Sequence, residues 1–177
     1  MAAGLRDIVD YLNSCKETVE LAPLRQLLLA TEISRQDISS HIRFLPDTYS
    51  RNLVTSSKWF ELLVLCWHAG HKSQIHDHAG SGCAFKIISG AATEVKCELT
   101  GRVSEKVKLV RPVSLNTYPV GSVCASRSED IHKIVNGGDG DLITVHIYSP
   151  PLNMNTYKFD PAEQAALAKF VPSSVTA

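Results

Sequence analysis

The chain has no excess of charge of either sign and no long apolar run. Its 177 residues contain 18 Lys and Arg and 18 Asp and Glu. Binding to nucleic acids or to anionic membranes needs a basic excess or a basic patch, which this balance does not indicate. The apolar run Leu62–Cys66 is far too short to cross a bilayer as a helix. We therefore expect neither a nucleic-acid partner nor a membrane partner.

Paired cysteine motifs and a secretion signal are also missing. The five cysteines form an odd set without a C-x-x-C motif, and the first residues, MAAGLRDIVD, lack a charged segment followed by an apolar one. These absences predict reduced thiols in the cytoplasm. Four of the cysteines are then expected to be small buried hydrophobic residues, namely Cys15, Cys66, Cys97 and Cys124.

The first quarter of the chain has helical patterns. The spacing of Leu5, Ile8, Val9 and Leu12 predicts one amphipathic helix, and Pro23 is expected to open a second. Ser34-x-x-Asp37 resembles a capping box and predicts a third, short helix over about 35–44. Residues 1–45 are thus expected to form N-terminal helices of a single domain that spans 1–177.

From Tyr49 on, short runs rich in β-branched and aromatic residues alternate with turn residues. These runs predict strands at 58–67, 74–78, 84–89, 91–99, 105–110, 114–118, 132–135 and 142–149. Many short strands are typical of a sandwich or barrel, so we expect a mainly β fold with a small barrel over 49–151 and the helices packed on one face. Pro150 and Pro151 should end the last strand, and residues 152–177 are expected to be a C-terminal extension that begins a short helix at Asp160-Pro161.

Two histidines one residue apart are the clearest chemical signal. In a strand, residues i and i+2 point to the same side, so His76 and His78 project together while Asp77 points away. Two neutral imidazoles side by side are poor core material unless a metal or polar groups satisfy their nitrogens. The pair therefore predicts a metal site.

The stretch GHKSQIHDHAGSGCAFKIISG, residues 70–90, has the pattern G-x5-H-x-H-x4-C-x6-G. It resembles the first motif of the cupin superfamily of small β-barrels, with Cys83 in place of the usual glutamate. Pro119-x-Gly121 and His132-x3-Asn136 resemble parts of the second cupin motif, which implies His132 as the third ligand. Three neutral imidazoles would leave a divalent ion with its full charge, which suits an anionic ligand such as a thiolate. The ligand set alone does not distinguish a zinc site from an iron site.

Three further segments resemble the cysteine dioxygenase family: YSRNLV at 49–54, LCWHAGH at 65–71 and TVHIYSPP at 144–151. The resemblance covers about 49–151. It implies Fe(II) as the cofactor, and L-cysteine and O2 as substrates that are converted to cysteine sulfinic acid. We expect a cytoplasmic enzyme that works as a monomer.

The resemblance also implies the roles of further residues. Cys83 would form a thioether with Tyr148 rather than bind the metal, and His146 would hydrogen-bond and orient the Tyr148 hydroxyl, with Thr144 behind it. On the last predicted strand these three polar residues alternate with Val145 and Ile147, so the polar face is expected to line the metal cavity.

Arg51, within Tyr-x-Arg-Asn, is implied to bind the substrate carboxylate, and Tyr49 to line the pocket. A guanidinium suits a carboxylate because it offers two parallel hydrogen bonds. Alternatives are a dioxygenase of another small thiol such as 3-mercaptopropionate, a non-catalytic metal-binding cupin, and a zinc hydrolase or isomerase, which would lack an evident carboxylate base beside the histidines. Departures from the family pattern are a shorter 124–132 segment, Gly82 before Cys83, and Asn155 in place of a cysteine.

Overall fold

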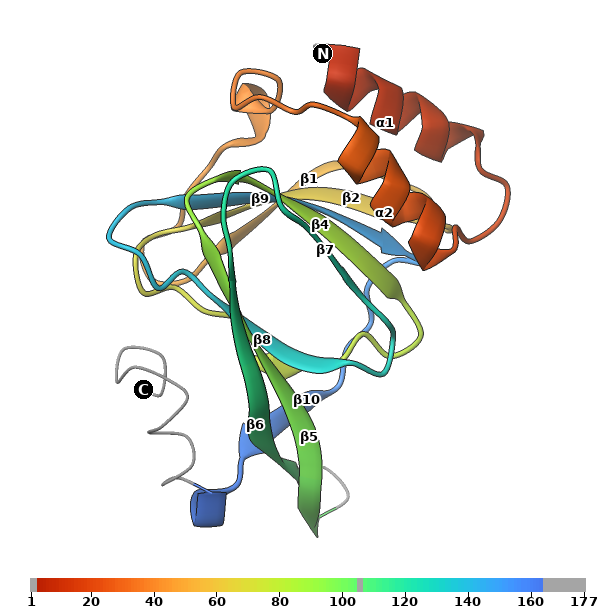
Figure 1. The fold of residues 1–177 in the computed structure, drawn as a ribbon. Coiled ribbons are helices and arrows are strands. Elements are labelled where there is room, and N and C mark those ends of the chain that lie inside the picture. Colours follow the sequence, from red (N-terminus) through yellow and green to blue (C-terminus); the bar gives the residue numbers. More distant parts are fainter. Residues whose placement is uncertain (1–2, 105–106, 164–177) are drawn as a thin grey trace.

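The computed structural model describes residues 3–104 and 107–163 (Figure 1). In this part of the chain, two α-helices and two 3-10 turns accompany ten strands. The helices and turns are α1 (Ala3–Ser14), α2 (Leu21–Ala30), η1 (Ser39–His41) and η2 (Pro161–Glu163). The strands are β1 (Ser50–Ser56), β2 (Glu61–Trp67), β3 (Ile75–His76), β4 (Gly82–Ser89), β5 (Ala92–Ser104), β6 (Val107–Tyr118), β7 (Val123–Ser126), β8 (Ile131–Val135), β9 (Leu142–Ser149) and β10 (Thr156–Phe159).

The strands form two sheets that enclose the interior of the molecule. One sheet has the order β1-β2-β9-β4-β7, and the other has the order β10-β3-β8-β5-β6. The second closes on itself because β10 pairs antiparallel with β3 and parallel with β6. The predicted mainly β fold with a barrel is therefore confirmed. No helix within the two described ranges is long and apolar enough to span a bilayer.

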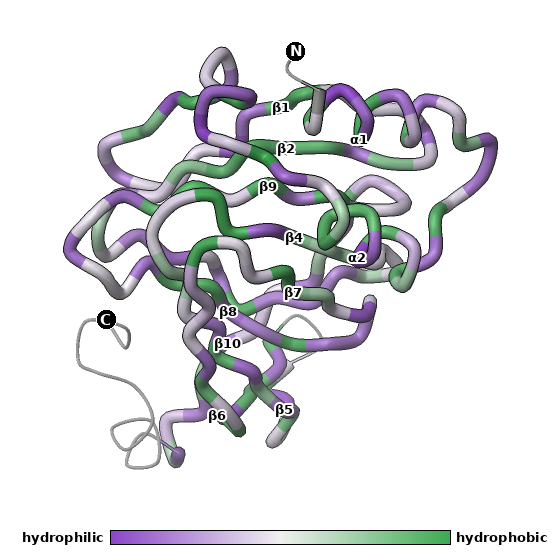
Figure 2. The backbone as a smooth tube through the Cα atoms, turned by 45° about the horizontal axis from the view of Figure 1, so that its top comes forward, coloured by the Kyte–Doolittle hydropathy of each residue, from purple (hydrophilic) through white to green (hydrophobic). Residues whose placement is uncertain are grey.

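Both α-helices pack on the outer face of the first sheet, as predicted (Figure 1). Their apolar faces meet the outward side chains of β2 and β9 in one core. Figure 2 shows β2 as a mostly hydrophobic strand beneath the helices. The predicted alternation of β9 is confirmed, since Val145 and Ile147 join this core. Core members from α1 and α2 are Leu5, Ile8, Val9, Leu12, Leu24 and Leu28.

The predicted third helix is wrong. The capping interaction itself exists, because Ser34 N donates to Asp37 Oδ2 at 2.8 Å and Asp37 N donates to Ser34 Oγ at 3.3 Å. The following backbone hydrogen bonds, however, join residues three apart, such as His41 N to Ile38 O at 2.8 Å. The segment is therefore a set of turns with η1, and only Ile38 within it is fully buried.

Two predicted strand boundaries also need correction. Residues 107–110 and 114–118, expected in two strands, lie in one strand, β6, whose Pro112 faces Cys97 at a register shift in β5. Residues 105–106 of the first expected strand lie outside the described residues. A bulge tolerates proline because the ladder is already interrupted there. The barrel continues past its expected end at residue 151, since β10 belongs to it. The expected C-terminal helix is a 3-10 turn as far as Glu163, and the remainder lies outside the described residues.

Lys86 joins the first sheet to α2. Its side chain is buried, and Nζ donates to the carbonyls of Leu28 at 2.9 Å and Thr31 at 2.6 Å, at the C-terminal end of the helix. Lys86→Met keeps an aliphatic stem but leaves both carbonyls without their donor. We expect the free energy of unfolding to fall by about 2–3 kcal/mol, measured by urea denaturation. Lys158→Met, at an exposed position of β10, is the control, and equal midpoints for the two variants would contradict this role.

Candidate metal centre

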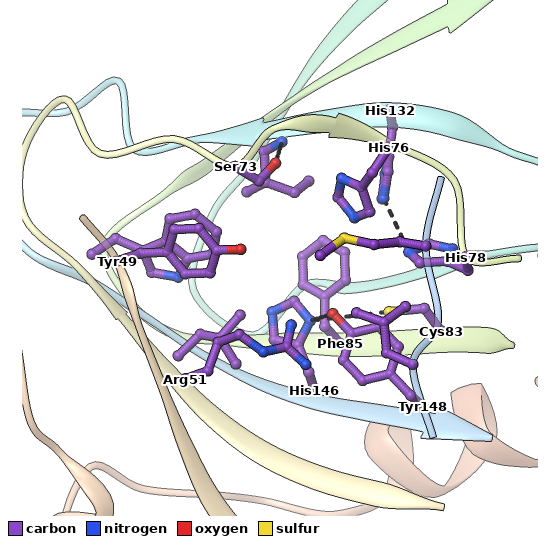
Figure 3. Close-up of a pocket in the computed structure, with 15 residues that line it drawn as sticks. Tyr49, Arg51, Ser73, His76, His78, Cys83, Phe85, His132, His146 and Tyr148 are labelled. Carbon is purple, nitrogen blue, oxygen red and sulfur yellow. Dashed lines mark hydrogen bonds between the residues drawn. The ribbon is translucent and has the colours of Figure 1, made fainter. Parts of the chain in front are cut away.

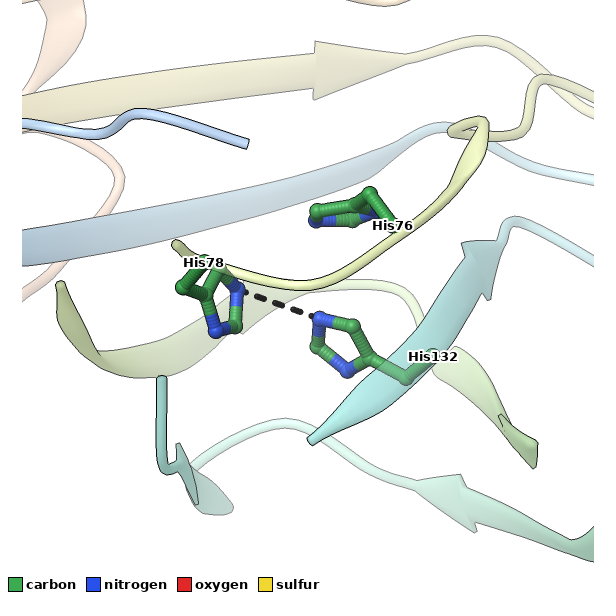
Figure 4. Close-up of side chains that lie close together, drawn as sticks. All are labelled: His76, His78 and His132. Carbon is green, nitrogen blue, oxygen red and sulfur yellow. Dashed lines mark hydrogen bonds between the residues drawn. The ribbon is translucent and has the colours of Figure 1, made fainter. Parts of the chain in front are cut away.

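Three histidine side chains converge inside the barrel. His76 ends β3, His78 follows it, and His132 lies on β8 directly opposite His76. One ligand nitrogen from each ring lies within 4.8 Å of the others (Figure 4). All three residues are buried, with exposed fractions of 8%, 0% and 2%. The structure thus brings together all three sequence-predicted ligands.

The other nitrogen of each ring is held by an acceptor. The Nδ1 atoms of His76, His78 and His132 lie 2.9 Å from Gln74 O, 3.3 Å from Arg127 O and 2.7 Å from Glu94 Oε1, respectively. Carbonyl and carboxylate oxygens accept protons in hydrogen bonds, so each Nδ1 carries the ring proton and each Nε2 presents a lone pair.

This arrangement fits a cation. Nε2 of His78 and Nε2 of His132 are 3.2 Å apart (Figure 4). With both ring protons on Nδ1, two lone pairs face each other across this distance, and they cannot hydrogen-bond to one another. A metal ion placed among the three Nε2 atoms would remove the repulsion.

Two of the rings, those of His76 and His78, are also kept neutral, as metal ligands must be. Burial, reinforced by the neighbouring His132, lowers the pKa of His76 to about 4 and that of His78 to about 3. Both therefore present unprotonated nitrogens at neutral pH.

Glu94 is a functional residue that the sequence reasoning missed. It is 2% exposed on β5, accepts from His132 and also from the Tyr118 hydroxyl at 3.2 Å. Burial is the largest single influence and raises its pKa, but His132, Lys96 and the Tyr118 hydroxyl together outweigh it, so the pKa is lowered and the carboxylate is charged. A carboxylate therefore does stand next to one histidine, but it lies behind the ring on Nδ1 and is not among the residues that line the pocket. Its position on the same face of the predicted strand as Ala92, which is buried, was the available signal.

Arg51 and Tyr49 form the opposite wall of the pocket (Figure 3). Arg51 Nη2 binds Glu61 Oε1 at 3.0 Å, and its Cζ lies 5.5 Å from the centre of the Tyr148 ring. Burial alone would lower the pKa of Arg51, but Tyr148 and Glu61 favour its charged form, and the net effect is a raised pKa. Its side chain is 32% exposed, so a ligand can reach it. Tyr49 is stacked on Trp67 with ring centroids 4.0 Å apart.

The third wall comes from neighbouring strands β4 and β9. Cys83 and Tyr148 are directly opposed across the two strands, and the Tyr148 hydroxyl lies 3.2 Å from Nδ1 of His146. His146 Nε2 is 2.9 Å from Thr144 Oγ1, which accepts from Trp67 Nε1 at 3.2 Å. Burial raises the pKa values of Cys83 and Tyr148, so both remain protonated. Among the described residues, the cluster that could hold a metal contains the three histidines and not Cys83.

Comparisons with known proteins give matches over most of the chain. Residues 3–161 match the family model described as cysteine dioxygenase type I. Curated relatives named cysteine dioxygenase type 1 include that of Danio rerio, 28% identical over 83% of this chain and 75% of the relative. Those of Rattus norvegicus and Homo sapiens are also 28% identical, over 84% of this chain and 76% of each relative.

Solved structures support the fold. A Klebsiella pneumoniae protein with a double-stranded β-helix domain superposes with a TM-score of 0.55 at 16% identity, covering 68% of this chain and 88% of that one. The protein TT1209 from Thermus thermophilus gives a TM-score of 0.50 at 16% identity, covering 65% and 95%. At this identity the likeness shows the barrel architecture alone.

Proposed function

The chain belongs to the cysteine dioxygenase type I family, and on this premise we propose that it oxidises L-cysteine with O2 to cysteine sulfinic acid. The observation that carries the proposal is the set of three buried imidazoles whose ligand nitrogens converge in the same pocket as the Arg51 guanidinium. The imidazoles suit a metal ion, and the guanidinium suits the carboxylate of an amino acid.

We propose that the metal is Fe(II), held by His76, His78 and His132. When bound, it would supply the redox chemistry of O2 and the positive charge that deprotonates a coordinated thiol. Glu94 fixes the tautomer of His132 and places a negative charge next to the ligand ring, which favours a cation there.

Arg51 binds and orients the substrate. It contacts Glu61 through Nη2 and also interacts with the Tyr148 hydroxyl, but a guanidinium carries five N–H donors, so donors remain for a carboxylate. The pocket between Arg51 and the histidines is lined by apolar side chains that limit the entry of water, including Leu65, Phe85, Ile134 and Leu152. Arg51 and the three histidines line the same pocket, so we expect one short amino acid to contact both ends of the site.

Tyr148 supplies a directed proton. Trp67 Nε1 can only donate, so Thr144 Oγ1 accepts from it and can give its own proton to Nε2 of His146. The ring proton of His146 then lies on Nδ1 and is donated to the Tyr148 oxygen. This chain of hydrogen bonds leaves the phenol proton of Tyr148 for a ligand oxygen in the pocket.

We further propose a thioether between Cys83 and a ring carbon of Tyr148. Their direct opposition on β4 and β9 supports it. The bond forms with loss of one hydrogen from sulfur and one from the ring, and O2, the co-substrate, is the oxidant that accepts both. The expected result is a fraction of iron-loaded protein about 2 Da lighter than the sequence mass, seen by intact mass spectrometry. Cys83→Ser should abolish this shift and keep the iron, while Cys97→Ser should retain it. A shift that survives in Cys83→Ser would place the bond elsewhere.

The test of the proposed function is anaerobic loading with Fe(II), followed by O2 uptake and identification of the product by mass. L-cysteine should give cysteine sulfinic acid and consume O2. Faster turnover of 3-mercaptopropionate or cysteamine would point to a dioxygenase of another thiol. Metal binding without O2 uptake by any thiol would show a non-catalytic cupin.

We also propose that the protein acts as a monomer in a reducing compartment. The second part is supported by the five cysteines, which are all free thiols. Size-exclusion chromatography with light scattering tests the first part of this proposal.

A further inference from the structure

Asp77 lies between two of the histidines and turns its side chain away from them, as the sequence predicted. Its carboxylate is 8% exposed and is surrounded by hydrogen-bond donors. Oδ1 accepts from Ala79 N at 3.1 Å and from Asn155 N at 3.0 Å, and Oδ2 accepts from the Tyr157 hydroxyl at 2.6 Å. Asn155 Nδ2 lies 3.2 Å and 3.1 Å from the two oxygens.

These contacts join two distant parts of the chain. Ala79 follows the histidine pair, whereas Asn155 and Tyr157 belong to the segment that leads into and forms β10. The backbone reinforces the junction, because Asp77 N donates to Asn155 O at 3.1 Å and β10 pairs with β3 beside it. Asp77 is thus the side chain through which the C-terminal strand holds the turn that carries two metal ligands.

The turn itself needs such support. Ala79 has φ of 40°, in the left-handed region that favours glycine, directly after His78. The hydrogen bond from Ala79 N to Asp77 Oδ1 stabilises this conformation, in the manner of an Asx turn. If the turn relaxed toward a more common backbone conformation, His78 would change direction relative to His76 and His132.

We propose that Asp77 is a positioning residue of the metal centre, which locks the His76–His78 turn to β10 so that the two Nε2 atoms keep their directions. The inference rests on the proposed metal site and adds a role for the C-terminal strand in it. Asp77 does not touch the metal in this account. It acts through the backbone of the turn.

The test is metal affinity, measured by chelator competition with Zn(II), and with Fe(II) under argon, at a temperature where circular dichroism shows every variant folded. Asp77→Asn keeps the shape of the side chain but turns an NH2 group toward donors. We expect its affinity to fall by about tenfold to a hundredfold, the range seen for residues that orient ligands. Tyr157→Phe keeps the charge of Asp77 and the buried ring but removes one hydrogen bond. We expect it to lower metal affinity by about threefold to tenfold.

Asp160→Asn is the matched control. Asp160 also anchors the C-terminal segment through its carboxylate, by accepting from Thr100 Oγ1 at 2.8 Å, but it lies beyond β10 and away from the histidine turn. It should leave metal affinity unchanged, even if it lowers the unfolding midpoint.

Wild-type affinity in Asp77→Asn, or an equal loss in Asp160→Asn, would overturn the inference. If Asp77→Asn does not fold, Tyr157→Phe decides, and wild-type affinity in that variant overturns the inference. A wild-type chain that binds neither ion would overturn the metal centre itself. A chain that binds metal in the expected order of variants but consumes no O2 with cysteine would overturn only the proposed reaction.

Discussion

His132→Ala is expected to reduce both metal content and cysteine-dependent O2 uptake to background, a loss of at least about a thousandfold in kcat/KM. The reason lies in the convergence of the three rings. His132 supplies the Nε2 nearest to that of His78, and it is the ring tied to the buried carboxylate of Glu94. Without it, two imidazoles remain and the Glu94 carboxylate loses its hydrogen-bond donor. Metal per chain is measured by elemental analysis, and O2 uptake with an oxygen electrode.

His41→Ala is the control for this variant. His41 lies on η1, outside the triad, and its loss should leave metal content and activity unchanged. Full metal loading and full turnover in His132→Ala would show that the three rings are not the metal site. That conclusion would hold whatever Tyr148 and Cys83 do.

Arg51→Gln is expected to lower kcat/KM for L-cysteine by about a hundredfold, with metal content unchanged. A glutamine keeps polar contacts but loses the charge and the paired N–H groups that fit a carboxylate. Because the Arg51 side chain is 32% exposed, solvent screens part of the interaction, and the loss is smaller than for a fully buried charge. Most of the effect should appear in KM, since Arg51 holds the substrate away from the reacting sulfur.

A substrate without a carboxylate sharpens this test. Cysteamine turnover, however slow, should be almost unaffected by Arg51→Gln, because it offers nothing for the guanidinium to bind. Arg111→Gln is the control, because Arg111 forms a similar ion pair with Glu98 at 2.6 Å on the β5–β6 hairpin. This variant should change the turnover of neither L-cysteine nor cysteamine. An unchanged KM for L-cysteine in Arg51→Gln would exclude the carboxylate role.

The parts of the fold that sequence could predict are those with a local period. The β9 alternation and the spacing of His76 and His78 each specify which side chains share a face, and the structure has both. The third ligand is different, because nothing local connects residue 132 to residue 76. Their pairing depends on the register between β3 and β8. The resemblance to the second cupin motif indicated His132, together with the small number of histidines on the other predicted strands.

The missed features depend on tertiary partners. β10 is four residues long and follows two prolines, so its pattern is too short to distinguish from a polar loop. Glu94 is buried because β8 places His132 against it, and a glutamate in a strand is otherwise read as solvent-exposed. The prediction of a third helix over 35–44 was wrong for the opposite reason. Its local capping signal is real, but the segment offers too small an apolar face to favour a helix.

The closure of the barrel by β10 sets the order in which the site can be assembled on the ribosome. All three histidines emerge from the exit tunnel before residues 156–159, which pair with β3 and β6. A nascent chain at that stage carries every ligand, yet the strand that secures two of them has not been made. If the proposed site holds its ion as described, stable capture would follow the synthesis of β10 and not that of the last ligand, His132.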